Sequence, residues 1–153
     1  MVDARRETAD FRFGLLAGLI VLVIQFVLGM AVNLFVTVPT HHPGANPPEY
    51  FSGVAQSVTW AILHGPLLLI LHASLGLLLV LSAFGLLFRA IRTRHSRMIW
   101  ITALGGLAIL FAGFNGGSFL NYHQDFSSML MAGFFAVAVL AYSAGLYLVD
   151  GSA

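Results

Sequence analysis

Long apolar stretches separated by short polar segments dominate the hydrophobic pattern of this sequence. A helix needs about 20 mostly apolar residues to cross the hydrocarbon core of a bilayer. Four stretches reach that length, at residues 13–38, 54–88, 98–120 and 126–149. The first is too long for the apolar part of a cleaved signal peptide. The pattern predicts an all-α membrane protein, an up-and-down four-helix transmembrane bundle in one integral membrane domain.

The second apolar stretch is too long for a single crossing. At about 1.5 Å per residue, a helix over its whole length would measure roughly 50 Å, against a hydrocarbon core of about 30 Å. The stretch contains Gly65 and Pro66, and proline removes a backbone donor and crowds the preceding turn. We therefore expect the crossing at residues 66–88 and an outer loop with an interfacial helix at 39–65, where Trp60 is a candidate anchor.

Charged residues are scarce and unevenly placed. Only 8% of the residues are charged, against about 25% in soluble proteins, which excludes a soluble enzyme and a nucleic-acid binder with a basic face. The seven basic residues are all arginines and form two clusters, Arg5, Arg6 and Arg12, then Arg89, Arg92, Arg94 and Arg97. Because loops rich in arginine stay in the cytoplasm, we expect both termini there, in the plasma (inner) membrane of a prokaryote, with the lipid bilayer as the surrounding partner.

Several kinds of chemistry are absent from the sequence. There is no cysteine, which excludes disulfides, thiolate metal sites and cysteine nucleophiles. No phosphate-binding glycine loop, HExxH motif or acidic pair for hydrolysis is present. No charged residue lies within a predicted span, which argues against an ion-coupled transporter.

The most informative residues are polar side chains at membrane depth, which are costly and often functional. Counted from the arginine and aspartate markers at about 1.5 Å per residue, one residue of each span lies roughly 25–32 Å from the inner face. These residues are Asn33, His72, Asn115 and Met131, and Gln25 falls nearer the midplane. They predict one layer of candidate site residues in the outer leaflet.

His72 is the central candidate of this layer. A histidine at this depth is expected to be neutral and to need a partner for its donor nitrogen. A hydrogen bond to Asn115 or Asn33 would satisfy it. Ligation of haem iron would do so equally well, because bundle cores regularly hold such cofactors. A proton relay is the third alternative.

Four other residues are candidates near this layer. His64 precedes His72 by eight residues, which is roughly 12 Å along a straight helix, so it is expected at the outer boundary in contact with water. His123 is a loop residue that could cap the site. Met129 and Met131 could supply a thioether ligand to haem, although methionine in an apolar helix more often serves packing.

The first outer loop contains a second group of polar residues. His41 and His42 are adjacent and could bind copper or zinc. The sequence supplies no third convergent ligand, so a solvated loop is the favoured interpretation. Glu49 is the only carboxylate between the first two spans.

Two segments resemble a known family. The stretch Gln25-Phe-Val-Leu-Gly-Met-Ala-Val-Asn33 resembles the end of the first helix in each half of haem A synthase, which runs Q-x-x-L-G-x-x-V. His72, followed by a run rich in leucine that ends at Arg89, is similar to the second helix of such a half. Members of this family consist of two fused four-helix halves, with bis-histidine haem sites formed by the second and fourth helices of a half.

The resemblance implies a role for His72 as an axial ligand of haem b. This chain has Ser128 and Met129 where the fourth helix of the family supplies its second histidine. Met131, Met129 and His123 are therefore the candidates for the opposite ligand. The resemblance also implies a homodimer, since two copies of a single half restore eight helices.

Three functions follow as alternatives. The first is b-type haem binding for electron transfer or for haem handling and cytochrome oxidase assembly, with Asn33 and Asn115 as hydrogen-bond partners of His72 and a membrane respiratory complex as partner. The second is a cofactor-free accessory subunit of a membrane complex. The third is a membrane enzyme at the outer leaflet that uses His64, His72 and Glu49.

Overall fold

The structure, a computed structural model, describes residues 2–148, with side chains from residue 8 onward. The described chain forms five α-helices and no strand. These helices are α1 (Val2–Phe35), α2 (Tyr50–His64), α3 (Leu67–Thr93), α4 (Ser96–Tyr122) and α5 (Asp125–Leu148).

Four of these helices are long and apolar enough to cross a membrane, and they correspond to the four predicted spans. They cover Thr8–Phe35, Leu67–Thr93, Ser96–Tyr122 and Asp125–Leu148. Two helices extend beyond the predicted spans by several residues, past the apolar part of the helix. Thus α1 begins before residue 13, and α3 continues through Arg89 and Arg92, because arginine is a good helix former. The last residue of the predicted fourth span, 149, lies outside the described residues.

The predicted break in the second apolar stretch is confirmed. Helix α2 ends at His64, the backbone of Gly65 is extended at φ −71° and ψ 170°, and Pro66 is the N-cap residue of α3. The start of α2 is fixed by Glu49, whose carboxylate accepts hydrogen bonds from the backbone N–H groups of Phe51 and Ser52. A side-chain acceptor at this position satisfies backbone donors that the first turn leaves free.

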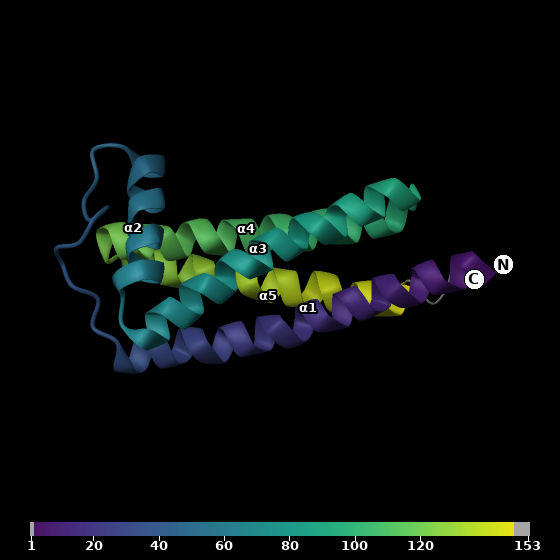
Figure 1. The fold of residues 1–153 in the computed structure, drawn as a ribbon, viewed down its shortest axis with the longest axis horizontal. Helices are drawn as coiled ribbons and strands as arrows, with labels where there is room; N and C mark the ends of the chain where they lie inside the picture. Colours follow the sequence, from purple (N-terminus) through teal and green to yellow (C-terminus); the bar gives the residue numbers. More distant parts are fainter. Residues whose placement is uncertain (1, 149–153) are drawn as a thin grey trace.

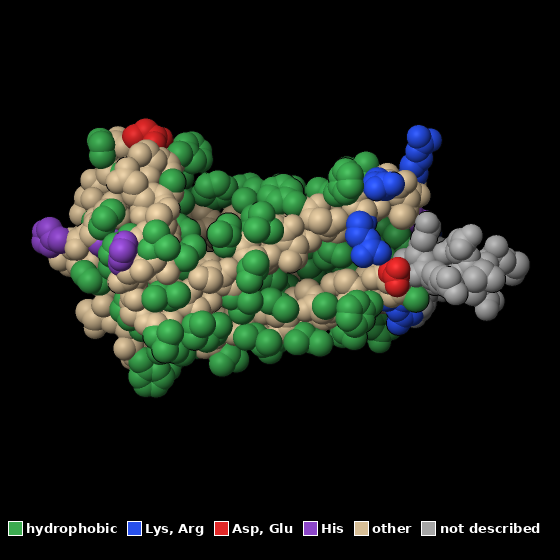
Figure 2. Space-filling model, in the orientation of Figure 1, with side chains coloured by type: hydrophobic (Ala, Val, Ile, Leu, Met, Phe, Trp, Pro, Cys, Tyr) green, Lys and Arg blue, Asp and Glu red, His purple; other side chains and the backbone are tan. Residues whose placement is uncertain are grey.

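The four long helices run side by side, and α2 lies across one end of them (Figure 1). Helix α1 packs against α3 and α5, and α4 packs against the same two helices from the other side. Helix α2 contacts only α3 and α4. We call residues 39–65, which comprise α2 and the loop before it, the cap. Figure 2 shows the blue arginine side chains at the end of the molecule opposite the cap, with a broad apolar band between.

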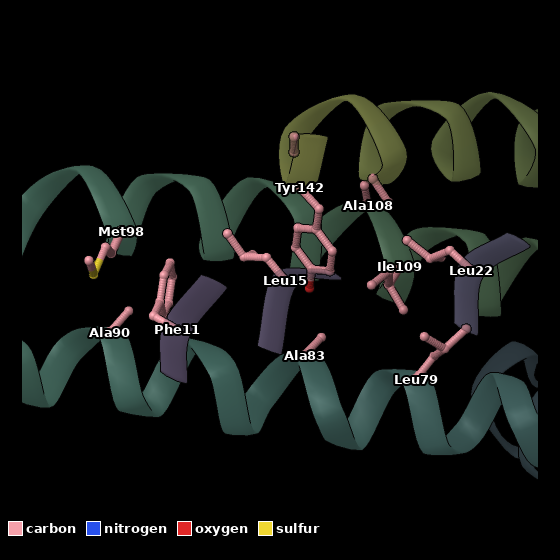
Figure 3. Packing of buried hydrophobic residues seen from close by; sticks show 12 residues of the cluster. Phe11, Leu15, Leu22, Leu79, Ala83, Ala90, Met98, Ala108, Ile109 and Tyr142 are labelled. Carbon is pink, nitrogen blue, oxygen red and sulfur yellow. The ribbon is translucent and has the colours of Figure 1, made fainter. Parts of the chain in front are cut away.

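The core between the long helices is built around one tyrosine (Figure 3). Tyr142 of α5 is 1% exposed, and its ring lies directly against Gly105 of α4, where a Cβ atom would overlap it. On the α1 side, a Cβ added at Gly18 would lie 3.1 Å from the same ring. The absence of a side chain at Gly18 and Gly105 therefore leaves room for the Tyr142 ring between α1 and α4.

Candidate functional site

His72 points inward from α3 onto the surface of α1. A Cβ atom added at Gly29 would lie 2.9 Å from Cε1 of His72, so the imidazole rests on the bare backbone of α1. Beside it, Nε2 of Gln25 donates to the backbone carbonyl of His72 at 3.1 Å and lies 3.5 Å from Nε2 of the ring. The predicted polar residue at membrane depth is thus part of the α1–α3 contact.

Two polar atoms of this contact have no hydrogen-bond partner. Nδ1 of His72 and Oε1 of Gln25 are both buried and both unpaired. An unpaired buried polar group costs roughly 1–3 kcal/mol, so the contact is not fully satisfied. The sequence predicted the residue but not the helix that it contacts.

The predicted partners of His72, Asn33 and Asn115, do not fill that role. Asn115 donates to the carbonyl of Phe111 on its own helix at 2.9 Å, and Asn33 is exposed on α1. The residue beside His72 is Gln25, which sequence counting put at a different depth.

The depth error has a simple geometric cause. Asp10 and Arg89 form an ion pair at 3.8 Å, which puts these two residues at the same level. His72 precedes Arg89 by 17 positions, and 17 positions after Asp10 is Val27, between Gln25 and Gly29. Seventeen positions after Arg12 is Gly29, so Asn33 entered the predicted layer only because a count of 21 residues was grouped with the count of 17 to His72.

The candidate thioether ligands Met129 and Met131 both lie on α5. Met131 is half-buried on α5, with its Sδ 3.3 Å from the position of a Cβ at Gly116 of α4. Met129 is 61% exposed. Helix α5 packs against α1 and α4 but not against α3, so both methionines lie on a helix that does not pack against the helix of His72. A haem with His72 and either Met129 or Met131 of the same chain as its axial pair does not fit this arrangement.

The cap is attached to the bundle through one buried amide. Asn121 is fully buried near the end of α4 and hydrogen-bonds the hydroxyl of Ser57 on α2. In the orientation that satisfies both amide atoms, its nitrogen faces the carbonyls of Gly44, Gly53 and Gly117 and its oxygen accepts from the N–H of Val54. The backbone carbonyl of Asn121 also accepts from the N–H of Asn46 in the loop, at 2.9 Å. Asn121 therefore links the loop, α2 and α4.

Gly44 lies directly on Ser57. A side chain at position 44 would overlap the Ser57 hydroxyl and its backbone nitrogen, and Gly44 has a φ of +89°, which glycine adopts without strain. A second link lies nearby, where the hydroxyls of Tyr50 and Ser118 are 2.7 Å apart. The contact of Gly44 with Ser57 therefore places the loop directly on α2, and the hydroxyls of Tyr50 and Ser118 join α2 to α4.

His42 belongs to this cap and is not a solvated loop residue as the sequence suggested. Its ring stacks on Trp60 of α2 with centroids 4.3 Å apart and an angle of 14° between the planes. Its Nδ1 lies 2.9 Å from the carbonyl of Pro43, and its Nε2 lies 3.1 Å from the carbonyl of Leu120. His41, by contrast, is exposed, and its Nδ1 lies 3.0 Å from the hydroxyl oxygen of its neighbour Thr40.

His123 lies beside His42 in the cap. It ends α4 in a left-handed conformation at φ 53°, with its ring centroid 6.3 Å from that of His42 and 6.2 Å from that of Phe119. Its Nε2 is buried without a partner. Within residues 8–148, no group of three histidine or acidic side chains is arranged to hold a metal ion.

His64 and Glu49 lie at opposite ends of α2, which separates them by roughly 20 Å at 1.5 Å per residue. His64 is exposed and lines a shallow cavity of about 360 Å³ together with Pro43, Gln56 and Trp60. The carboxylate of Glu49 is occupied with capping α2. These residues do not converge with His72 on one catalytic centre.

The residues that sequence reasoning missed are Ser57, Asn121 and the partners of His42. A polar pair such as Asn121 and Ser57 has no spacing motif, since 64 residues separate them. Comparisons with family models, with curated proteins and with solved structures give no match for this chain.

Proposed function

We propose that this protein is a multi-pass protein of a prokaryotic plasma membrane, with its four long helices running up and down and both termini in the cytoplasm. The support is the charge distribution, since the arginines gather at the end opposite the cap (Figure 2) and arginine-rich segments stay inside. The cap then lies on the outer side of the membrane.

The absence of cysteine makes this topology directly testable. Gln56 on α2 and Ser96 at the start of α4 are both exposed. In intact cells, a membrane-impermeant maleimide is expected to label the Gln56→Cys variant. The Ser96→Cys variant is expected to react only after permeabilisation. Labelling in the opposite order would contradict the proposed orientation.

Our proposal for the function is a cofactor-free accessory subunit of a membrane complex, which acts through its surfaces. One observation carries it: the imidazole of His72 rests on Gly29 with the Gln25 amide on its backbone carbonyl. The histidine at membrane depth thus serves helix packing, as polar residues between transmembrane helices commonly do.

The enzyme alternative has less support. It requires Glu49, His64 and His72 to act together, but the first two flank a helix of 15 residues and the third faces α1. General acid–base catalysis needs groups within about 3 Å of the same substrate atoms.

The accessory role is tested by whether the protein is monomeric or part of a larger assembly in native membranes. After chemical crosslinking in the membrane and solubilisation in a mild detergent, the chain is expected in a stoichiometric assembly, with a second copy or with a membrane respiratory complex as the partner. The His72→Leu variant, which places an apolar side chain at the site, is expected to remain in the assembly. A chain that is monomeric in the membrane and in two detergents would contradict the proposal.

One observation favours a second candidate function, haem b ligation by His72. Nδ1 of the ring is buried and unpaired, so it retains a lone pair or a proton without a partner. Since Met129 and Met131 lie on α5, which does not pack against α3, this function draws its opposite ligand from a second copy. Titration of the purified protein with haemin tests it. A Soret band that saturates at one haemin for each pair of chains and is absent in His72→Leu supports haem binding. Identical titrations of the two proteins exclude it.

A further inference from the structure

The strongest unassigned feature of the molecule is the environment of the His42 ring. Both ring nitrogens face carbonyl oxygens, Nδ1 that of Pro43 at 2.9 Å and Nε2 that of Leu120 at 3.1 Å. A carbonyl oxygen only accepts hydrogen bonds, so each contact requires an N–H on the ring. Neutral imidazole carries one N–H and the imidazolium carries two. The site therefore suits the protonated form.

The stacked indole favours the same form. The ring of His42 lies parallel to that of Trp60 at 4.3 Å, over the electron-rich face that attracts cations. A protonated His42 ring in this position is attracted to the indole face more strongly than a neutral ring is. Two carbonyls and one indole face thus surround the ring with electron-rich groups from the loop, α4 and α2.

The other titratable groups around His42 are few. His123, at the end of α4, is the one whose ring contacts it, at 6.3 Å between centroids. His41 precedes it in the loop and turns its ring to Thr40. On α2, His64 lies one turn beyond Trp60, and Glu49 caps the opposite end of that helix. Helix α5 begins at Asp125, two residues after His123.

We propose that His42 is a proton-operated clamp that fastens the cap to the end of the bundle. With the ring protonated, one side chain links the loop to α4 through Leu120 while it lies on Trp60 of α2. Only the Nε2 contact reaches the bundle, since the Nδ1 contact is an exposed one within the loop. On loss of the proton, a neutral ring with its N–H on Nδ1 leaves the Leu120 carbonyl facing a lone pair. The cap is therefore held more firmly while the ring is protonated and loosens when the proton is lost.

The accessibility of position 57 on α2 can report this loosening. Ser57 is fully buried directly beneath Gly44, so reagents reach position 57 only when the loop lifts. The neighbouring Gln56 is exposed. The chain has no cysteine of its own, so a single cysteine introduced at either position reports on that position alone.

The test compares the Ser57→Cys and Gln56→Cys variants of the full-length protein in nanodiscs. Because Ser57→Cys replaces the hydroxyl that bonds Asn121, every comparison is made within that background. The maleimide reaction rate of the first is divided by that of the second, which cancels the effect of pH on thiol chemistry. We expect this ratio to rise roughly tenfold between about pH 5.5 and pH 8. With His42→Gln added the ratio should be high at both pH values, and with His41→Gln added the rise should persist. A ratio that does not depend on pH, or a rise that survives in His42→Gln, overturns the proposal.

Hydrogen exchange in the unmodified protein gives a second test that needs no variant. The amides of Ala45 and Asn46 donate to the carbonyls of His42 and Asn121. After correction for the intrinsic effect of pH, their protection is expected to fall several-fold from pH 5.5 to about pH 8. The amides of α4 provide the internal control, because their helix does not depend on the clamp. Equal protection of the loop at both pH values contradicts the clamp.

Discussion

Gln25 and His72 meet across the α1–α3 contact, with the amide of Gln25 donating to the backbone carbonyl of His72 at 3.1 Å. The imidazole occupies the space above Gly29, where α1 has no side chain. A glycine on one helix and a large polar side chain on the next form a contact that depends on shape as much as on hydrogen bonding.

The Gly29→Ala substitution is expected to destabilise the protein by about 1–3 kcal/mol, because the new methyl group would lie 2.9 Å from Cε1 of His72 and force the helices or the ring to shift. Unfolding in mixed micelles containing SDS measures this change. Gly133→Ala is the matched control, since nothing lies within 4 Å of a Cβ at that position. An effect of equal size in both variants would contradict the proposed contact.

Replacing Tyr142 by phenylalanine is expected to leave stability unchanged or to raise it by about 1 kcal/mol. The hydroxyl of Tyr142 is buried without a hydrogen-bond partner, so its removal relieves a desolvation cost while the ring keeps its place against Gly105 and Gly18. The same unfolding measurement applies, with Tyr147→Phe, which is 87% exposed, as the control. A loss of more than about 1 kcal/mol would reveal a partner that the structure does not contain.

Asn121→Ala is expected to release the cap. The substitution removes the amide that links Ser57 to the loop carbonyls, leaving buried groups unpaired at a cost of at least about 2 kcal/mol. Limited proteolysis should then cleave within residues 39–49 much faster than in the unmodified protein. Asn115→Ala removes only a hydrogen bond within one helix and should leave the cleavage rate unchanged. If both variants are cleaved at the original rate, Asn121 does not hold the cap.

The ion pair between Asp10 and Arg89 is expected to matter little for stability. The side chains are 71% and 54% exposed and the atoms are 3.8 Å apart, and such pairs contribute about 0–1 kcal/mol. Asp10→Asn should therefore change the free energy of unfolding by less than about 0.5 kcal/mol, and less still in high salt. A loss of about 2 kcal/mol would show that the pair is shielded from solvent.

The number of spans and the break at Gly65 and Pro66 could be predicted from the sequence, because span length and proline geometry are local properties. The ends of the helices could not, since α3 continues through Arg89 after its apolar residues end. Hydropathy reports the environment of a residue, and a helix does not have to stop where that environment changes.

The site was predicted only in part. The sequence identified His72 as the important polar residue at membrane depth, but its contact with Gln25 and Gly29 depends on how α1 is shifted along α3. The prediction grouped counts of 17 to 21 residues into one layer, a range of about 6 Å along a helix, which is too wide to fix that shift. The surroundings of His42 depend on Trp60 and Leu120, which are distant in sequence, so no local pattern reveals them.

We propose that His72 packs helix α1 against helix α3 and carries no cofactor. The absorption spectrum of the protein, purified from its own membranes in mild detergent and recorded oxidised and reduced, tests this most directly. We expect no Soret band in the unmodified protein and an intact helical fold in the His72→Leu variant. A stoichiometric Soret band that shifts on reduction and disappears in His72→Leu would contradict the account.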